Sequence, residues 1–352
     1  MTGVKTLELA PGYSISRVIR GGWQLAGGHG PIDDQAAIED MAAFYDAGII
    51  TFDCADIYTG VEELIGRFRA EYAARHGAGA LARLKVHTKF VPDLDMLPQM
   101  SRSYVQSVID RSLRRLGLEC LDLVQFHWWD YTVPGCVETA LWLAELQRVG
   151  KIKLLGGTNF DTPHVEALAT AGVPLNSLQV QYSVLDRRPE NGLAAVCARL
   201  GVHLMCYGTV AGGFMGETWL GGPEPTGSLE NRSLAKYKLI IDDFGGWNLF
   251  QELLGALHEI GQRHAVGPGV VASRYILQKP GVAAVIIGAR DRVHLAENVA
   301  LGCLRLEPRD LAEIEAVLVR SRGPLGDVYA LERDRKGRHG AIMRYNLNKL
   351  SA

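Results

Sequence analysis

Eight short apolar runs, separated by longer segments with helical periodicity, are the feature of this sequence that most restricts its fold. The runs lie at residues 17–20, 49–52, 84–88, 121–126, 152–155, 177–180, 202–205 and 284–287. In the segments between them, apolar residues return every three or four positions, as along one face of an amphipathic helix. Residues 34–47 and 104–116 show this spacing. The chain therefore alternates predicted strands with predicted helices.

Eight such alternations, without a break in composition, predict an α/β fold of the (β/α)8 TIM-barrel type. The alternative, an open doubly wound sheet, usually carries a G-x-G-x-x-G turn after its first strand. Here the first strand is followed by Gly21-Gly22-Trp23-Gln24, which lacks that fingerprint. Four of the 40 glycines instead follow predicted helices, where a C-terminal cap often needs a positive φ: Gly48, Gly117, Gly150 and Gly201. We expect one barrel domain over residues 1–320.

Two segments depart from the repeating pattern. Residues 217–247 are rich in glycine, proline and charge, and we predict that they form a long lid-like loop within the barrel domain. Residues 321–352 form a charged C-terminal extension that we expect to lie outside the barrel. The loop and the part of the extension from Tyr329 to Tyr345 are expected to close the substrate pocket.

Composition excludes several classes of protein. The formal net charge of −2 argues against a nucleic-acid partner, and no stretch approaches the roughly 20 apolar residues that span a membrane. The N-terminal residues lack the apolar core of a signal peptide, and the six cysteines form no C-x-x-C pair. We expect a cytoplasmic protein without a metal site.

Four ionisable residues lie at or just after the ends of three consecutive predicted strands. Asp53 ends the second strand and Tyr58 lies in its loop, while Lys89 ends the third strand and His127 the fourth. The carboxyl ends of barrel strands open on one face, so we expect these side chains to meet there. A nearby ammonium favours the phenolate of a tyrosine. The group suits proton transfer to or from an oxygen, with Asp53 holding Lys89 and His127 donating a hydrogen bond to a carbonyl oxygen or sharing in proton delivery.

Each of the four residues, taken alone, also has a structural interpretation. Asp53 could cap a helix or turn, and Lys89 could be a solvated charge at a strand end. Tyr58 could pack within its loop, and His127 could be a hydrogen-bonded histidine of the core. Their joint position on one face favours catalysis over these alternatives.

The segments that contain these residues, together with several later ones, resemble the aldo-keto reductase family. The matching segments are 52–58, 87–89, 122–128, 150–160, 179–182 and 285–290, followed by Glu297-Asn298. They occur in the family's order and at similar spacings from about Ile15 to Leu304. The resemblance implies an NAD(P)H-dependent oxidoreductase that interconverts aldehydes or ketones with alcohols. In it Tyr58 is the proton donor, Lys89 and Asp53 assist, and His127 orients the substrate.

The resemblance also implies a cofactor site. Asn159 and Gln179 fall on the positions that bind the nicotinamide carboxamide, with Thr158 where serine is usual, and Tyr207 on that of the ring that stacks on the nicotinamide. Residues 210–214 resemble the segment along the pyrophosphate, and the pair at 297–298 matches the one that contacts adenine. The predicted set is Gly22, Trp23, Thr158, Asn159, Gln179, Tyr207, Gly208, Val210, Gly212, Gly213, Gly288, Arg290, His294, Glu297 and Asn298.

The choice between NADP and NAD depends on the residues after the eighth strand. Many NADP-using members have lysine and serine there and a later arginine, where this chain has Gly288, Ala289 and His294. Arg290 offers a guanidinium that suits a 2′-phosphate. We therefore expect NADP (NADPH) as the preferred cofactor, with NAD as the other option.

Trp23 follows the first strand, and Trp128 and Trp129 follow the fourth, so we expect aromatic walls beside the reacting carbonyl. Packing at the rim of the barrel is the alternative for each tryptophan. Aromatic walls suit apolar and sugar-like substrates equally. The expected partner is a small-molecule carbonyl or alcohol substrate, with a sugar as one option.

Two other functions fit the same residues. One is a sugar or alcohol dehydrogenase that works mainly in the oxidative direction. The other is a cofactor-sensing regulatory subunit, which would keep the site but act through a partner surface. Nothing in the sequence marks such a surface.

Overall fold

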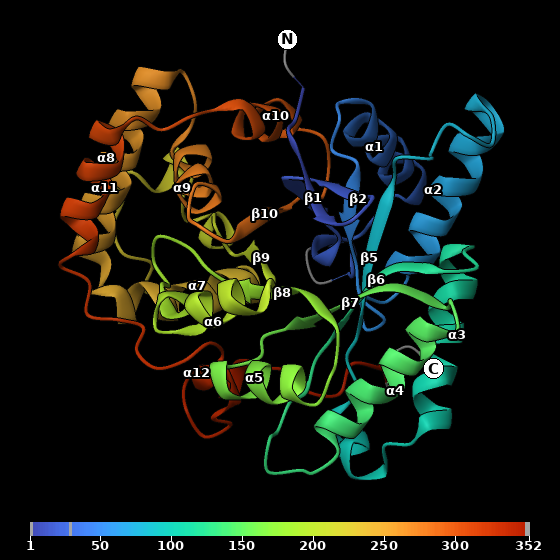
Figure 1. Ribbon diagram of the computed structural model, residues 1–352. Helices are drawn as coiled ribbons and strands as arrows, with labels where there is room; N and C mark the ends of the chain where they lie inside the picture. The colour runs from blue at the N-terminus through green and yellow to red at the C-terminus, as the bar shows by residue number, and fades with distance from the viewer. Residues whose placement is uncertain (1–2, 28–29, 349–352) are drawn as a thin grey trace.

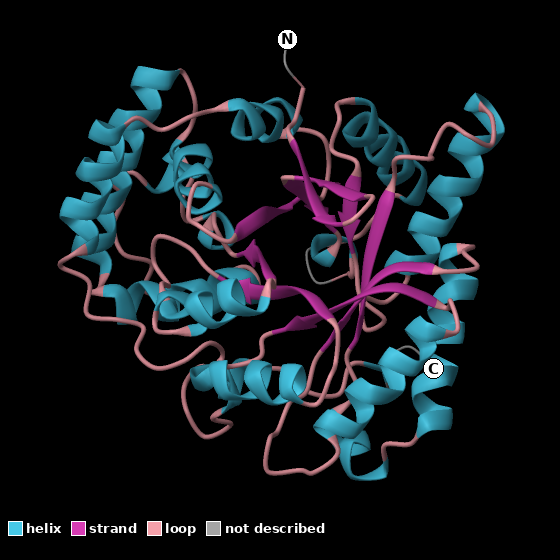
Figure 2. Cartoon of the chain, in the orientation of Figure 1, coloured by secondary structure: helices cyan, strands magenta, loops and turns pink. Residues whose placement is uncertain are grey.

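The computed structural model describes residues 3–27 and 30–348, and eight parallel strands form a closed barrel at its centre (Figure 1, Figure 2). Around the barrel the strands follow the order β10-β3-β4-β5-β6-β7-β8-β9. They are β3 (Val18–Gly21), β4 (Thr51–Asp53), β5 (Lys85–Phe90), β6 (Leu121–Phe126), β7 (Ile152–Thr158), β8 (Leu175–Gln181), β9 (His203–Tyr207) and β10 (Val282–Gly288). Each overlaps one of the eight predicted runs, so the predicted (β/α)8 TIM barrel is confirmed.

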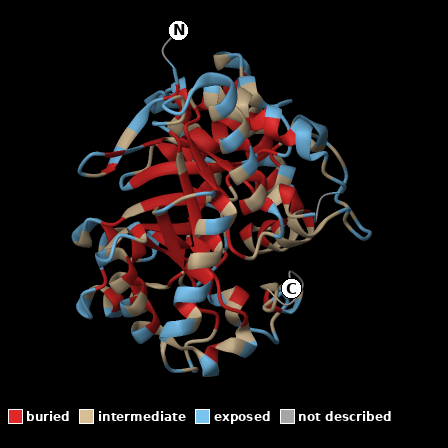
Figure 3. Cartoon of the chain, turned by 90° about the vertical axis from the view of Figure 1, so that its right-hand side faces the viewer, coloured by how far each residue is buried: buried red, intermediate tan, exposed pale blue. Residues whose placement is uncertain are grey.

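Helices surround the barrel (Figure 2). They are α1 (Asp34–Asp46), α2 (Val61–His76), α3 (Arg102–Leu116), α4 (Cys136–Arg148), α5 (Thr162–Thr170), α6 (Leu193–Leu200), α7 (Arg232–Phe244), α8 (Trp247–His264), α9 (Pro268–Leu277), α10 (Leu295–Cys303), α11 (Pro308–Leu318) and α12 (Ala330–Arg333). The glycines predicted to end helices all have positive φ, as at Gly117 (+62°). The strands read as apolar runs because both their faces are covered, and Figure 3 shows them largely buried.

A hairpin that the sequence did not reveal closes one end of the barrel. β1 (Thr6–Ala10) and β2 (Tyr13–Ser16) pair antiparallel. Tyr13 and Ile15 are buried in a cluster with residues of the barrel strands. Lys85, the first residue of β5, lies with its Nζ 5.3 Å from the centre of the Tyr13 ring. The hairpin therefore lies toward the amino-terminal ends of the strands, which leaves the carboxyl ends for a site.

The predicted lid-like loop at 217–247 is only partly a loop. It contains a short 3-10 helix, η5 (Glu217–Trp219), and then the whole of α7. Leu234, Tyr237 and Ile241 are buried in the core from this helix. The second half of the predicted loop is therefore a helix. The segment was predicted to be a loop because the glycine- and proline-rich stretch in its first half dominates its composition.

The C-terminal extension packs on the barrel through α12 and a short 3-10 helix, η6 (Gly340–Ile342). Arg333 donates to the backbone carbonyls of Trp128 and Asn159, which follow β6 and β7. The backbone N–H of Leu94 donates to the carbonyl of Tyr345. The last four residues of the predicted extension lie outside the described residues. In the described part of the chain, no helix has the length and apolar character needed to cross a membrane.

Candidate active site

A cavity of about 410 Å³ opens at the carboxyl ends of the strands, and all four predicted catalytic residues line it. Asp53 ends β4, Tyr58 lies in the loop after it, Lys89 is near the end of β5, and His127 directly follows β6. Parallel pairing brings these strand ends together, with Asp53 opposite His87 and Lys89 opposite Gln125. The barrel thus brings together four residues that are spread over 75 positions of the sequence.

Lys89 and Asp53 form a buried ion pair at the floor of the cavity. Lys89 Nζ lies 2.6 Å from Asp53 Oδ2 and donates a second hydrogen bond of 2.8 Å to the carbonyl of Cys54. Only 5% and 4% of the two side chains are exposed. Burial acts to lower the pKa of Lys89, but Asp53 and Tyr58 together raise it above its ordinary value. Lys89 is therefore charged at neutral pH.

Two amides hold the other oxygen of Asp53. Gln125 Nε2 donates to Asp53 Oδ1 at 2.9 Å, and Gln179 Nε2 donates to the same oxygen at 2.7 Å. Gln179 also donates to Gln125 Oε1 at 3.1 Å. The carboxylate is fixed from both sides, so it presents Lys89 in one orientation. The sequence did not indicate Gln125 as part of this network.

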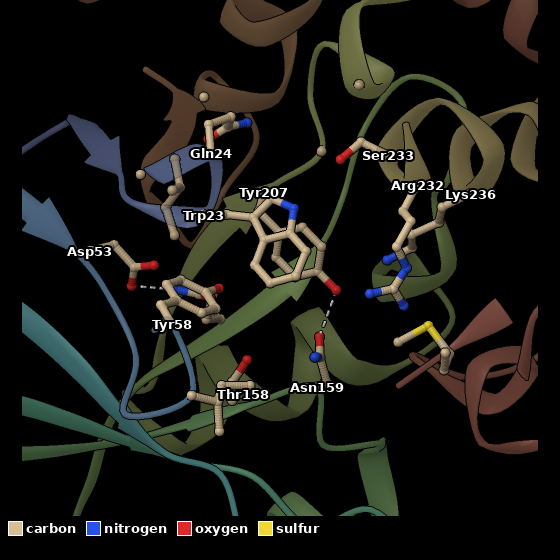
Figure 4. A pocket seen from close by; sticks show the side chains of 18 of the residues that line it. Trp23, Gln24, Asp53, Tyr58, Thr158, Asn159, Tyr207, Arg232, Ser233 and Lys236 are labelled. Atoms are coloured by element: carbon tan, nitrogen blue, oxygen red, sulfur yellow. Dashed lines mark hydrogen bonds between the residues drawn. The ribbon is translucent and has the colours of Figure 1, made fainter. Parts of the chain in front are cut away.

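Tyr58 lies beside the ammonium of Lys89, whose Nζ is 5.1 Å from the centre of the phenol ring. The ring also meets Trp23 edge to face, with centroids 5.2 Å apart (Figure 4). Burial raises the pKa of Tyr58, although Lys89 acts to lower it. Lys89 therefore offsets part of the effect of burial rather than lowering the pKa below its ordinary value. The phenol is protonated near neutral pH, as a proton donor must be.

His127 is held in one tautomer. Its Nδ1 lies 2.9 Å from the carbonyl oxygen of Thr158, which can only accept, so Nδ1 carries the proton. Burial, with a smaller contribution from Arg333, lowers the pKa of His127 to about 3. The ring is neutral, and its Nε2 has no hydrogen-bond partner among the described residues. In this tautomer Nε2 can accept a hydrogen bond but cannot donate one, which differs from the expected donation to a carbonyl oxygen.

Most of the predicted cofactor residues line the same cavity: Trp23, Thr158, Asn159, Gln179, Tyr207, Gly208, Val210, Gly212 and Gly288. The hydroxyl of Tyr207 donates to Asn159 Oδ1 at 2.9 Å (Figure 4). Asn159 directly follows β7 and has a φ of +60°, in the left-handed region. Gly22 and Gly213 do not line the cavity, but each adjoins a residue that does.

The glycine segment after β9 packs closely against α7. Gly212 has a φ of +66°, and a Cβ there would lie 2.9 Å from the Tyr237 ring and 3.1 Å from the backbone of Ser233. A Cβ on Gly208 would clash with the Tyr237 hydroxyl. Only glycine lets the backbone run this close to α7 along the cavity wall. The phosphate path along this segment stays a prediction.

The residues predicted for the far end of the cofactor lie outside this cavity. Arg290 is exposed and donates to the carbonyl of Pro31 at 3.1 Å. His294 Nδ1 lies 3.0 Å from Glu297 Oε2, and Glu297 lines a second cavity of about 360 Å³. Asn298 Nδ2 is buried and has no hydrogen-bond partner in the part of the chain that the structure describes. These residues form a separate group beside α10, and the structure does not bring them to the catalytic four.

The three tryptophans separate into two kinds. Trp23 and Trp129 line the cavity, and Trp129 meets His127 edge to face with centroids 4.3 Å apart. Trp128 is fully buried away from it, where its Nε1 donates to the carbonyls of Asp130 and Val133. Trp128 is therefore not among the residues that line the cavity, because the side chains of neighbouring residues 128 and 129 face different ways.

Both segments that were expected to close the substrate pocket contribute residues to it, although the sequence did not single these residues out. Arg232 and Lys236 come from α7, and Tyr329, Met343 and Arg344 come from the C-terminal extension. The i, i+4 spacing of the two α7 cations could have indicated them once the helix was predicted.

Comparison with known proteins extends these observations. A model described as the aldo/keto reductase family matches residues 17–319. Probable aldo-keto reductase 1 of Glycine max is 26% identical over 327 residues, covering 90% of this chain and 88% of that protein. The NADH-specific methylglyoxal reductase of Escherichia coli (strain K12) is 25% identical over 313 residues, covering 84% and 93%.

Among solved structures, the glycerol dehydrogenase AKR11B4 from Gluconobacter oxydans has the same fold with a TM-score of 0.73. It is 21% identical and covers 89% of this chain and 94% of its own. The family match includes every barrel strand and each of the four residues that meet at the cavity floor. The chain belongs to the aldo/keto reductase family, a family of oxidoreductases that act on carbonyl compounds.

Proposed function

We propose that this protein is an NADPH-dependent reductase of small aldehydes or ketones, with Tyr58 as the proton donor. The observation that carries the proposal is that Tyr58, the buried pair of Lys89 and Asp53, and His127 meet in one cavity. A reduced nicotinamide bound in this cavity supplies the hydride that the carbonyl carbon receives. The chain's own residues then supply the proton that the carbonyl oxygen takes up.

Proton transfer follows from the charges around Tyr58. The phenol, protonated at neutral pH, donates its proton to the carbonyl oxygen as negative charge develops there. Lys89 stabilises the phenolate that remains, since its pKa is raised and it stays an ammonium. Asp53 fixes the direction of that ammonium, because Gln125 and Gln179 hold the carboxylate.

The residues around the cavity fit a nicotinamide dinucleotide. Tyr207 orients the side chain of Asn159 and leaves its amide N–H groups for a carboxamide oxygen. In the glycine segment at 212–213, a Cβ on Gly213 would meet nothing within 4 Å among the described residues, which supports a path for phosphates past its backbone. Arg290 supports NADPH over NADH, because in the described part of the chain its guanidinium is exposed and contacts a carbonyl rather than a carboxylate.

Tyr58→Phe tests the proton donor. We expect the variant to bind NADPH with unchanged affinity in a fluorescence titration, while turnover on a panel of aldehydes and ketones falls at least about 100-fold. Tyr72→Phe is the matched control, because the Tyr72 hydroxyl binds Asp46 outside the cavity. Turnover retained by Tyr58→Phe would contradict the role.

Arg290→Met tests the cofactor. We expect weaker binding of NADPH and little change for NADH. Tight binding of NADH but not of NADPH to the unaltered protein would overturn the preference, and the name of the Escherichia coli relative shows that the family includes an NADH-specific enzyme.

One observation favours a second candidate, a dehydrogenase of alcohols or sugars. With Nδ1–H bound to the Thr158 carbonyl, His127 Nε2 accepts a hydrogen bond, and an alcohol substrate offers a hydroxyl to donate it. In the reductive direction the same nitrogen meets the hydroxyl of the product. Initial rates in both directions, at physiological ratios of oxidised to reduced cofactor, decide between the candidates.

A further inference from the structure

Three cationic side chains line the cavity. Figure 4 shows two of them, Arg232 and Lys236, across the view from Asp53 and Tyr58. Arg232 and Lys236 extend from successive turns of α7, and Arg344 comes from the C-terminal extension. In the part of the chain that the structure describes, none of the three forms an ion pair. Positive charge therefore collects on one wall, and the nearby carboxylates of Glu332 and Asp186 offset it only in part.

Lys236 is the most enclosed of the three. Its Nζ lies 5.2 Å from the centre of the Tyr207 ring and 5.8 Å from that of Tyr329, without a hydrogen bond to a described residue. Burial lowers its pKa, against an opposing effect of Glu332. The oxygens of Glu332 and of its neighbour Asp186 are already bound by Arg188. Among the described residues, the Lys236 ammonium therefore contacts aromatic rings rather than a carboxylate or another hydrogen-bond acceptor.

The two guanidinium groups add to this charge. Arg232 Nη2 donates to the carbonyl of Ile342 at 2.9 Å, which directs its side chain toward the extension. Burial, and then the charge of Arg344, lowers the pKa of Arg232. Two like charges on one cavity wall repel each other, so an arrangement that keeps both is favoured when an anion lies between them.

The cations occupy the face of α7 that adjoins the one packed on the glycine segment. Ser233 and Tyr237, four residues apart, pack on Gly212. Arg232 is directed toward the extension through the carbonyl of Ile342. Lys236 lies between the rings of Tyr329, Tyr237 and Tyr207, the last of which is predicted to stack on the nicotinamide. The charge therefore lies where the predicted nicotinamide position meets the C-terminal extension.

We propose that Arg232, Lys236 and Arg344 form an anion subsite that binds a carboxylate or phosphate of the substrate, so that the preferred substrates are anionic aldehydes or ketones. This rests on the proposed function, because it assumes that the carbonyl lies at Tyr58. The anion and the carbonyl then occupy opposite walls of the cavity, and the subsite sets the orientation in which the carbonyl reaches the phenol.

Two substrates of equal shape test the subsite: 4-carboxybenzaldehyde, which is anionic, and 4-formylbenzamide, which is neutral. The unaltered protein is expected to have the higher kcat/KM for the anion. Lys236→Met is expected to lower the ratio of the two kcat/KM values about ten-fold, and Lys236→Arg to keep most of it. Lys238→Met is the matched control on the same helix, because Lys238 is paired with Glu224 and Asp242 outside the cavity.

A binding measurement separates this proposal from the proposed function. Terephthalamic acid and its neutral analogue terephthalamide cannot be reduced as aldehydes, and calorimetry measures their affinities with and without NADPH. Tighter binding of the acid that is lost in Lys236→Met supports the subsite even if no carbonyl is reduced. Equal affinities for the two compounds would overturn it. So would a loss of NADPH affinity in Lys236→Met with an unchanged substrate ratio, since the cations would then serve the cofactor phosphates.

Discussion

Arg188 and Glu332 form a two-point ion pair inside the protein, with Arg188 Nη1 and Nη2 each 2.9 Å from one carboxylate oxygen. Both side chains are only 1% exposed. Asp186 accepts two further hydrogen bonds from the same guanidinium. Because Glu332 belongs to α12 and Arg188 follows β8, this pair fastens the C-terminal extension to the barrel. It thereby holds Tyr329 against the cavity.

Glu332→Gln is expected to lower the free energy of unfolding at pH 7 by about 3 kcal/mol, since it removes one partner of a buried pair. Burial acts to raise the pKa of Glu332, but Arg188 holds it at about 2, against about 4.3 in an unfolded chain. A carboxyl group with a lowered pKa stabilises the folded state at pH values above its pKa in the unfolded chain. This stabilisation is lost as the pH falls toward 2. The difference between the proteins should therefore shrink below about pH 4.3.

Denaturant titrations at a series of pH values measure this difference. Glu252→Gln is the control, because Glu252 pairs with Arg320 at the surface and should contribute less than about 1 kcal/mol. A Glu332→Gln effect that stays constant down to pH 2 would contradict the assigned ion pair.

Lys89→Met is expected to reduce kcat by about 10²- to 10⁴-fold and to move the basic limb of the pH–rate profile upward. The reason is that the ammonium alone lowers the pKa of Tyr58 against burial. The double variant Asp53→Asn/Lys89→Met avoids an unpaired buried carboxylate and should show the same rate loss with NADPH binding retained. A profile unchanged by Lys89→Met would show that Lys89 does not act on Tyr58.

His127 is expected to remain neutral with its proton on Nδ1 throughout the range from pH 5 to 8. Its pKa lies at about 3 because burial disfavours the imidazolium, so no limb of the pH–rate profile in this range belongs to it. Long-range ¹H–¹⁵N spectra of the ring report the tautomer directly, and His127→Gln identifies its signals. A proton on Nε2, or a titration between pH 5 and 8, would be inconsistent with the bond to Thr158.

Arg333 is expected to act as a positioning residue. Its Nη2 donates to the carbonyl of Asn159 at 2.8 Å and to that of Trp128 at 3.2 Å, on either side of His127. Arg333→Lys should lower kcat about ten-fold with a smaller change in thermal stability, because a single ammonium lacks the planar guanidinium fork. Arg333→Met should also raise the pKa of His127, which the ring spectra measure. Arg335→Lys, on a surface pair with Asp130, is the control.

The barrel could be predicted because its strands are covered on both faces and so appear as uninterrupted apolar runs. The catalytic four followed from it, since the ends of parallel strands must meet. The helix α7 was missed because residues 221–225 look like a loop, although Leu234, Tyr237 and Ile241 carry a helical period. The tautomer of His127 depends on a carbonyl 31 residues away, and no local pattern encodes it.

Because Arg188 holds the extension on the barrel, two separate parts of the chain contribute to the cavity. In the proposed mechanism, proton transfer depends on residues from β4 to β6, while Tyr329, Met343 and Arg344 in the final stretch line another part of the cavity wall. The selectivity of this scaffold can therefore be altered by exchanging its C-terminal end for that of a relative, with the proton-transfer machinery left intact.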